Sequence, residues 1–211
     1  MIIAIDGPAA SGKGTLARRL AAHLGYAHLD TGKIYRAVGL KMLRTGLDLE
    51  DPKAAAGMAA TLSHTDLDDP ELAGDRAAEA ASKVAALADV RAVLLDFQRT
   101  FAANPPGGLP GAVLDGRDIG TVVCPEADVK LFVTAAVEAR AERRHKELLG
   151  RGIDIIYPTV LADLQRRDAR DAGRSISPMR QAEDAIVIDS TNLDPDAAFE
   201  RALAEVANQP R

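Results

Sequence analysis

The feature that most constrains the fold is a short apolar segment that runs directly into a glycine-rich loop and then into a helical pattern. Residues Ile2 to Ile5 are all apolar, and Asp6-Gly7-Pro8 follows them. Such a run is typical of a strand that is buried on both faces of a parallel sheet. Leucines then recur at helical spacing between Lys13 and Leu24, and Gly25 fits the end of a helix. This order predicts an α/β protein.

The rest of the chain repeats the alternation of strand and helix. Further strands are expected at residues 26–29, 112–114, 129–133 and 185–188. Further helices are expected at residues 34–46, 135–149, 159–170 and 195–207. Residues 48–103 are alanine-rich and mostly helical in propensity, with a loop at residues 61–74. The pattern predicts a five-stranded parallel sheet with helices on both faces and a helical insertion.

Composition narrows the class of protein. A chain of 211 residues is expected to form one domain. Its net charge of −5 and its 3% of aromatic residues argue against a nucleic-acid partner. The single Cys124 excludes an intramolecular disulfide and a cysteine zinc cluster. No apolar run approaches the ~18 residues of a membrane span, so we expect a cytoplasmic protein with no membrane partner. We also expect a monomer.

Acidic residues follow four of the five expected strands. They occur in Asp6-Gly7, Asp30-Thr31-Gly32, Asp115-Gly116-Arg117-Asp118 and Asp189-Ser190-Thr191. The carboxyl ends of parallel strands share one edge of the sheet, where ligands bind in such folds. One shared site is therefore expected there.

The glycine-rich segment has the spacing of a phosphate loop, Gly-x4-Gly-Lys, between a strand and a helix. Its backbone N–H groups and the helix N-terminus are expected to bind the phosphates of ATP, and Lys13 to reach the β- and γ-phosphates. The stricter motif has Ser or Thr directly after the lysine, whereas Gly14 intervenes here. The predicted ATP-binding residues are Gly7, Pro8, Ala9, Ala10, Ser11, Gly12, Lys13, Gly14 and Thr15.

Four motifs together resemble one branch of the nucleoside monophosphate kinases, the bacterial cytidylate kinases. They are Gly12-Lys-Gly-Thr15, Leu29-Asp-Thr-Gly32 with Tyr35-Arg36, Asp115-Gly-Arg-Asp-Ile-Gly-Thr121, and Arg167-Asp-x-Arg-Asp171. The resemblance covers essentially the whole chain, and the run from Asp115 is its most discriminating part. It implies transfer of the γ-phosphoryl group of ATP to CMP and dCMP with Mg²⁺.

The resemblance also implies roles for individual residues. Arg117 would bind the acceptor phosphate, and Asp118 would accept a hydrogen bond from the exocyclic amine of cytosine, as a carboxylate can. Arg36 lies one turn into a helix and suits an oxyanion, while Thr31 stands where Ser is usual. The CMP-binding set is Thr31, Arg36, Ser82, Arg91, Arg117, Asp118, Arg167 and Asp171. The catalytic set is Lys13, Arg117, Arg140, Arg144 and Arg174, with Thr15 and Asp115 as the Mg²⁺ ligands.

We divide the single domain of residues 1–211 into three regions. The core comprises residues 1–34, 112–139 and 175–211; residues 35–111 bind the monophosphate, and residues 140–174 form a mobile lid. Arg140, Arg143 and Arg144 share one helical face there, which could equally be a solvated face. Residues 63–76 are short and turn-rich, whereas many cytidylate kinases carry an insert of several strands at this point.

Other functions are less well supported. A UMP/CMP, adenylate-type or dephospho-coenzyme-A kinase would share the phosphate loop, but the run from Asp115 to Thr121 argues against the last two. A GTPase-like switch would need an Asn-Lys-x-Asp segment after a strand, and the sequence has none. An inactive relative would not need Lys13 and the arginines. The four histidines show no metal-site spacing and are interpreted as incidental.

Overall fold

The structure is a computed structural model, and it describes residues 1–208. The chain forms two compact units. One unit is made of residues 1–28 together with the part of the chain from Pro105 onward, and the other is made of residues 29–104. The boundary of the predicted lid stays a prediction.

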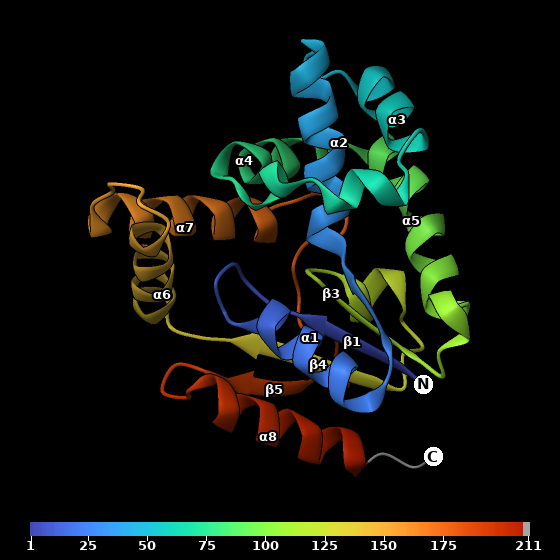
Figure 1. Ribbon diagram of the computed structural model, residues 1–211, viewed down its shortest axis with the longest axis vertical. Coiled ribbons are helices and arrows are strands. Elements are labelled where there is room, and N and C mark those ends of the chain that lie inside the picture. The colour runs from blue at the N-terminus through green and yellow to red at the C-terminus, as the bar shows by residue number, and fades with distance from the viewer. Residues whose placement is uncertain (209–211) are drawn as a thin grey trace. The chain divides into compact units, whose positions relative to one another are not determined.

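A five-stranded parallel sheet organises the fold, as predicted (Figure 1). Its strands are β1 (Ile2–Asp6), β2 (Ala27–Asp30), β3 (Ala112–Gly116), β4 (Val129–Thr134) and β5 (Ile186–Asp189). The order across the sheet is β2-β3-β1-β4-β5. Central β1 pairs in parallel with β3 and β4, with Asp6 opposite Gly116 and Phe132. Four of the five residues of β1 are buried, which explains its continuous apolar run.

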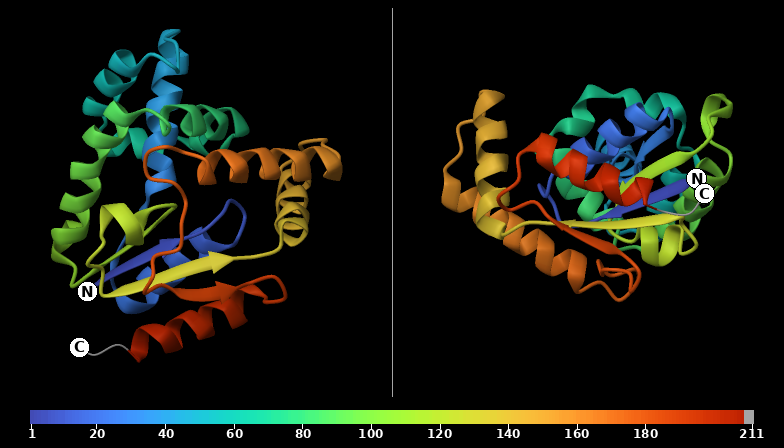
Figure 2. Two further views of the ribbon diagram at one scale, coloured as in Figure 1. Left: turned by 180° about the vertical axis from the view of Figure 1, so that it is seen from behind. Right: turned by 90° about the horizontal axis from the view of Figure 1, so that it is seen from below.

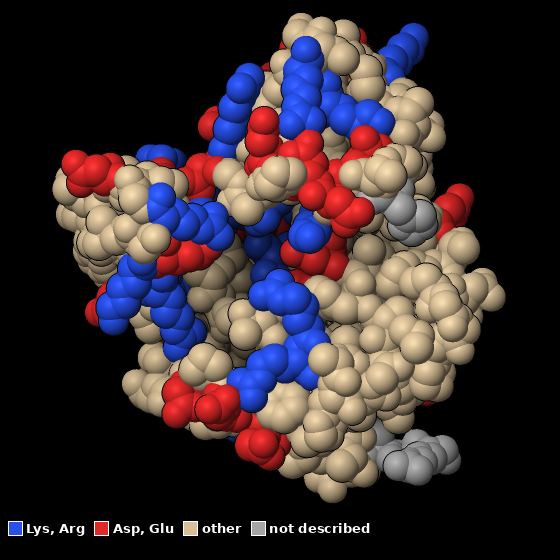
Figure 3. All heavy atoms as spheres, viewed as in Figure 1, with Lys and Arg blue, Asp and Glu red and all other residues tan. Residues whose placement is uncertain are grey.

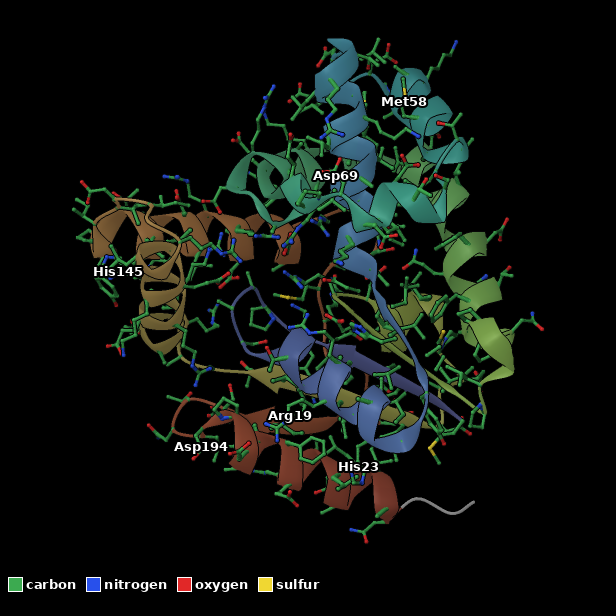
Figure 4. All side chains as sticks on the ribbon, in the orientation of Figure 1. Arg19, His23, Met58, Asp69, His145 and Asp194 are labelled. Carbon is green, nitrogen blue, oxygen red and sulfur yellow. The ribbon has the colours of Figure 1, made fainter. Side chains whose placement is uncertain are left out.

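Helices of the first unit cover the sheet and extend beyond it. They are α1 (Lys13–Leu24), α6 (Val137–Gly150), α7 (Tyr157–Ala172) and α8 (Pro195–Ala207). Buried side chains of α1 and α8 form one core cluster with those of β1, β4 and β5. Figure 4 marks Arg19 and His23 where α1 meets α8; the Arg19 guanidinium lies 4.5 Å from the centre of the Phe199 ring, and the His23 ring 5.6 Å from it.

Helix α6 leaves the carboxyl end of β4, and α7 packs beside it. The left view of Figure 2 shows the segment between α7 and β5 returning to the sheet. Helix α7 begins at Tyr157, two residues earlier than the sequence predicted, because Pro158 occupies the first turn, where its missing N–H costs nothing. A π-helix over Ile119–Val123 follows β3 and was not predicted.

The second unit is helical from Thr31 onward. Its helices are α2 (Thr31–Thr45), α3 (Pro52–Ala60), α4 (Asp75–Val84) and α5 (Ala88–Ala103). The loop expected at residues 61–74 contains two short 3₁₀ helices, His64–Asp68 and Pro70–Ala73, so the expectation of a plain loop was wrong. The side chain of Asp66 accepts a hydrogen bond from the backbone of Ser63, and that of Asp69 from Glu71, which stabilises these turns. Between residues 31 and 104, all of them described, no strand occurs.

The 3₁₀ turn Pro106–Gly108 links this unit back to β3. The apolar core of the second unit is built from α2, α3, α4 and α5, with Ile34, Met42 and Val84 fully buried. Helices α2 and α4 pack closely because position 39 is glycine; a Cβ there would lie 2.7 Å from that of Ala80.

Candidate active site

The loop between β1 and α1 has the backbone of an anion-binding loop. Gly7 has φ of +147°, and a Cβ at this position would lie 2.0 Å from the carbonyl oxygen of Val133, so only glycine fits. Gly12 caps α1 in the left-handed conformation without a side-chain hydrogen bond. No side chain therefore caps the N-terminus of α1, where backbone N–H groups favour an anion. Lys13 Nζ lies within the same loop, 3.4 Å from the carbonyl oxygen of Pro8.

Two side chains hold the carbonyl groups of this loop from outside. Ser190, after β5, donates from Oγ to the carbonyl oxygen of Ser11 at 2.9 Å. Arg140, on α6, donates from Nη1 to the carbonyl oxygen of Ala9 at 3.2 Å. The guanidinium of Arg140 also donates to the carbonyl of Ala135 and to Asp168 at 2.7 Å, and only 5% of the residue is exposed. The contacts of Arg140, a predicted catalytic residue, thus brace the phosphate loop.

The predicted arginine face of α6 divides into separate contacts. Arg143 donates to the hydroxyl and carbonyl oxygens of Ser190, so it stabilises the loop after β5. Arg144 forms an ion pair with Glu147 at 2.9 Å. Figure 3 shows basic and acidic side chains gathered together over α6 and α7. The positive charge of the α6 arginine face is therefore partly neutralised by acidic side chains of α6 and α7.

Asp115, at the end of β3, is 3% exposed and faces the start of α1. Its Oδ2 lies 3.6 Å from the place that a Cβ on Gly14 would occupy, one residue before Thr15. Its Oδ1 lies 2.8 Å from Nε2 of His28. His28, the second residue of β2, is therefore a hydrogen-bond partner of a predicted metal ligand, a contact that the sequence did not predict.

The hydroxyl of Thr15 and the carboxylate of Asp115 are hard oxygen donors of the kind that Mg²⁺ prefers. Magnesium at such sites is held by one or two protein oxygens together with substrate phosphates and water. The pair fits that requirement. Within residues 1–208, no group of three or more acidic, histidine or cysteine side chains is arranged to hold a metal by itself.

Arg117, Asp171 and Arg174 form a buried charge cluster. Asp171 on α7 accepts from Arg117 Nε at 2.9 Å and from Arg174 Nη2 at 2.5 Å. Burial acts to raise the pKa of Asp171, but the nearby charges of Arg117, Arg174 and Arg167 outweigh it and hold the pKa below its usual value. The structure thus brings Arg117, which follows β3, together with three predicted site residues from much later in the chain: Arg167, Asp171 and Arg174.

Asp118 lies directly after Arg117 and is 6% exposed. Its backbone carbonyl accepts hydrogen bonds from Val122 and Val123, which closes the first turn of the π-helix. The backbone of Asp118 is therefore fixed at the start of the π-helix. The sequence predicted a tight turn at Asp118. It carried no signal for a π-helix, whose hydrogen-bonded turn holds one residue more than that of an α-helix.

The remaining predicted residues belong to the second unit. Arg91 is 7% exposed, donates to the carbonyl of Ala85 at 3.1 Å, and lies 5.5 Å from the ring centre of Tyr35. Ser82 is buried on α4, and Arg36 on α2 donates to the carbonyl of Leu72 at 3.2 Å.

Thr31 is buried as the first residue of α2. The helix is capped by Asp30, whose side chain accepts from the N–H of Lys33, and not by the hydroxyl of Thr31.

Comparisons with known proteins are consistent along the whole chain. The family model described as cytidylate kinase matches residues 3–208. A cytidylate kinase of Paramagnetospirillum magneticum is 62% identical over 99% of this chain and 98% of its own length. One of Rhodospirillum rubrum is 57% identical over 99% and 98%. One of Xanthobacter autotrophicus is 58% identical over 98% and 97%.

Solved structures resemble the fold at much lower identity. An uncharacterized protein from Eubacterium ventriosum superposes with a TM-score of 0.56 at 18% identity, with 99% of each chain covered. A sugar kinase from Janibacter sp. superposes with a TM-score of 0.50 at 15% identity, with 98% of this chain and 94% of the other covered. These likenesses concern the fold alone. In the described part of the chain, no helix is long and apolar enough to cross a membrane.

Proposed function

The chain belongs to the cytidylate kinase family, and from this membership we propose how its residues transfer the γ-phosphoryl group of ATP to CMP and dCMP. The observation that carries the assignment of residues is the uncapped start of α1 with Lys13, in the same compact unit as the turn from Asp115 to Asp118. The first element suits a donor polyphosphate, and the second suits a phosphate and a base.

The donor is proposed to bind in the phosphate loop, residues Gly7 to Thr15. The backbone N–H groups at the start of α1 contact the β- and γ-phosphates, and the ammonium of Lys13 adds a mobile charge. Arg140 and Ser190 hold two carbonyl groups of the loop. This leaves the loop preorganised before ATP arrives, so little reorganisation is needed during transfer.

The acceptor is proposed to bind at the turn after β3. Arg117 contacts the phosphate of CMP, and Asp118 accepts a hydrogen bond from the amino group of cytosine. Arg167 and Asp171 contact the ribose and phosphate on the same side. Arg36, Ser82, Arg91 and Thr31 are proposed CMP contacts as well, on the resemblance alone.

Phosphoryl transfer asks little covalent chemistry of the protein, and positioning and electrostatic stabilisation carry the rate. Lys13 and Arg174 are proposed to stabilise the charge that develops on the transferring group, with Arg144 added as the lid closes. Mg²⁺, held by Thr15 and Asp115 through direct or water-mediated contacts, would neutralise phosphate charge when bound. We assign no residue as a general base.

The experiment is a survey of acceptors. Purified protein receives ATP and Mg²⁺ with CMP, dCMP, UMP, AMP or dephospho-coenzyme A, and the release of ADP is followed. CMP and dCMP are expected to be the best substrates. Preferential phosphorylation of AMP or of dephospho-coenzyme A, or ADP release that ignores the acceptor, would overturn the proposal.

We propose further that the protein acts as a monomer in the cytoplasm, where its nucleotide substrates occur. A net charge of −5 disfavours self-association through neutral patches. Light scattering after size exclusion should return a mass near 22.3 kDa. A stable dimer mass would refute the monomer.

A further inference from the structure

A buried carboxylate at the end of β1 holds the turn that follows β3. Asp6 is 4% exposed. Its Oδ1 accepts a hydrogen bond from the N–H of Ile119 at 2.8 Å, and its Oδ2 accepts one from the N–H of Gly120 at 2.8 Å. The two carboxylate oxygens of Asp6 therefore accept hydrogen bonds from two consecutive N–H groups at the start of the π-helix. Asp118 is the residue immediately before them.

The same residue is continuous with the phosphate loop. Asp6 directly precedes Gly7, which is confined by the carbonyl group of Val133. A shift of the Asp6 backbone would therefore move the loop, and a shift of its side chain would move the turn. One residue links the backbone that holds the donor to the backbone that carries Arg117 and Asp118.

Pairing of the strands does not require this carboxylate. The backbones of β1 and β3 already pair from Ile2 opposite Ala112 to Asp6 opposite Gly116. The two additional hydrogen bonds lie beyond the end of that ladder, where the chain turns. Asp6 lies close beside this turn: a Cβ on Gly120 would be in ordinary contact with Asp6 Oδ2 at 3.5 Å and would press on the Lys130 side chain, with Cδ at 3.2 Å.

Keeping the buried Asp6 carboxylate charged lowers the stability of the folded state. Burial raises the pKa of Asp6 to about 6, against the two backbone hydrogen bonds that lower it. Asp118 also raises the pKa, and Arg117 lowers it. Lys130 packs its methylene groups beside Gly120 but sends its ammonium to Asp184 at 2.7 Å, so it does not neutralise Asp6. A costly buried carboxylate next to a binding loop is a candidate for a functional role.

We propose that Asp6 is a positioning residue for the acceptor: its carboxylate fixes the backbone from Asp118 to Gly120 and thereby aims the Asp118 side chain at the base. This rests on the proposed function of Asp118 in reading cytosine. Asp6 itself touches no substrate in this scheme. Its effect should therefore be seen in the choice between CMP and UMP, which share the ribose and phosphate and differ in the base.

The test uses Asp6→Asn in the full chain. The amide keeps the size of the side chain but offers one acceptor oxygen, and its NH₂ group faces the second N–H. We expect kcat/KM for CMP to fall by roughly ten- to a hundredfold, the scale of one mismatched buried hydrogen bond. The CMP-to-UMP ratio should fall by about fivefold or more, while KM for ATP stays within about twofold.

Asp128→Asn is the matched control. Asp128 Oδ2 accepts a hydrogen bond from the N–H of Ile2 at 2.6 Å, so the same chemistry occurs at the opposite end of β1, away from the site. Its CMP-to-UMP ratio should equal that of the wild type. A double variant, Asp6→Asn with Asp118→Asn, should lower the ratio no further than Asp118→Asn alone if Asp6 acts through Asp118.

Two results would overturn the proposal: a CMP-to-UMP ratio in Asp6→Asn equal to that of the wild type, or additive losses in the double variant. Failure of the wild type to prefer CMP would instead refute the proposed function, so the two failures are distinguishable. If Asp6→Asn does not fold, Asp6→Ser, whose smaller hydroxyl fits the same space and accepts one hydrogen bond, is measured in the same way and judged by the same ratio.

Discussion

Arg117, at the end of β3, donates from Nε to Oδ2 of Asp171 on α7 at 2.9 Å, although 54 positions separate them in the chain. Asp171 is 2% exposed, and Arg174 donates to its other oxygen. The ion pair joins the turn that follows β3 to α7, the second helix of the predicted lid. Breaking one partner of a buried ion pair is costly because the other charge stays buried.

Asp171→Asn should therefore destabilise the protein strongly at neutral pH, by about 3 kcal/mol or more. The pKa of Asp171 is lowered in the folded state. Its contribution is thus present above the usual pKa of an aspartate and is lost as the pH falls through the lower folded value. Urea unfolding of wild type and variant should show a large difference at pH 7 that shrinks below about pH 4.

Asp163→Asn is the control for that substitution. Asp163 lies on the same helix, is exposed, and pairs with exposed Arg166. Exposed ion pairs contribute about 0–1 kcal/mol. A loss of stability in Asp163→Asn as large as in Asp171→Asn would show that the helix, rather than the buried cluster, is sensitive.

Lys13→Ala tests the donor side. Removing a preorganised electrostatic donor costs roughly 10²–10³ in turnover, and we expect a loss of at least that size with ATP and CMP. The thermal midpoint should stay close to that of the wild type, because the substitution leaves the backbone of the phosphate loop, with Gly7 and Gly12 in their required conformations, unchanged. Lys53→Ala, on exposed α3, should leave turnover unchanged. Turnover of Lys13→Ala within tenfold of wild type would contradict the role.

The sequence was sufficient for the sheet and for most helices because their signals are local. The run Ile2 to Ile5, the glycine at the end of α1 and the proline in α8 each act within one turn or one strand. The motif residues could be recognised as well, because their spacing is a property of the chain, whereas their roles stay predictions. Asp115, Arg117 and Asp118 could be named before the structure was known.

Contacts between distant segments could not be predicted in this way. His28 meets Asp115 across 87 positions, and Asp6 meets Ile119 across 113. His28 does not stand out in its own neighbourhood of the sequence, and Asp6 could be placed only at the carboxyl edge of the sheet, without its partners. The 3₁₀ turns at residues 64–73 were missed because their N-caps, Ser63 and Asp69, resemble ordinary loop residues.

The region from Arg140 to Arg174 is predicted to move. Its own apolar cluster is small, built on Ala141, Leu148, Val160 and Leu164, and Ile153 and Ile156 near its tip are exposed. Few buried contacts favour local opening. Amide exchange at residues 146–160 should be faster than in β1 and should slow when ATP and CMP are both bound. Equal exchange with and without nucleotides would argue against a lid.

The raised pKa of Asp6 predicts that the free energy of unfolding depends on pH. Because the folded state holds the proton more tightly than the unfolded chain, the stability contribution of Asp6 is greatest below pH 3.8 and is lost as the pH rises through about 6. Asp6→Asn removes this loss, so the stability of the variant relative to wild type should rise by up to about 3 kcal/mol between pH 4 and pH 7.

Urea unfolding at four pH values measures this difference. Asp128→Asn, which removes a hydrogen-bonded carboxylate at the opposite end of β1, is unfolded in parallel as the control. A relative stability of Asp6→Asn that stays flat across the window would mean that the carboxylate is not the source of the cost.

The sharpest prediction concerns the base. Cytosine presents an amino donor where uracil presents a keto oxygen, and a carboxylate accepts from the first but repels the second. Asp118→Asn keeps the shape, and its amide can rotate to donate. The variant should lose kcat/KM for CMP, while that for UMP holds or improves. One mismatched buried polar contact corresponds to roughly tenfold to a few hundredfold in the ratio.

Arg117→Lys separates this from a bracing role of Asp118. Arg117 is proposed to contact the phosphate, which CMP and UMP share, so its replacement should lower kcat/KM for both by the same factor. If Asp118 only braced Arg117 in the turn, Asp118→Asn would behave in the same way and leave the CMP-to-UMP ratio unchanged. A ratio that changes in Asp118→Asn and not in Arg117→Lys assigns the reading of the base to the carboxylate, because only the base differs between the two acceptors.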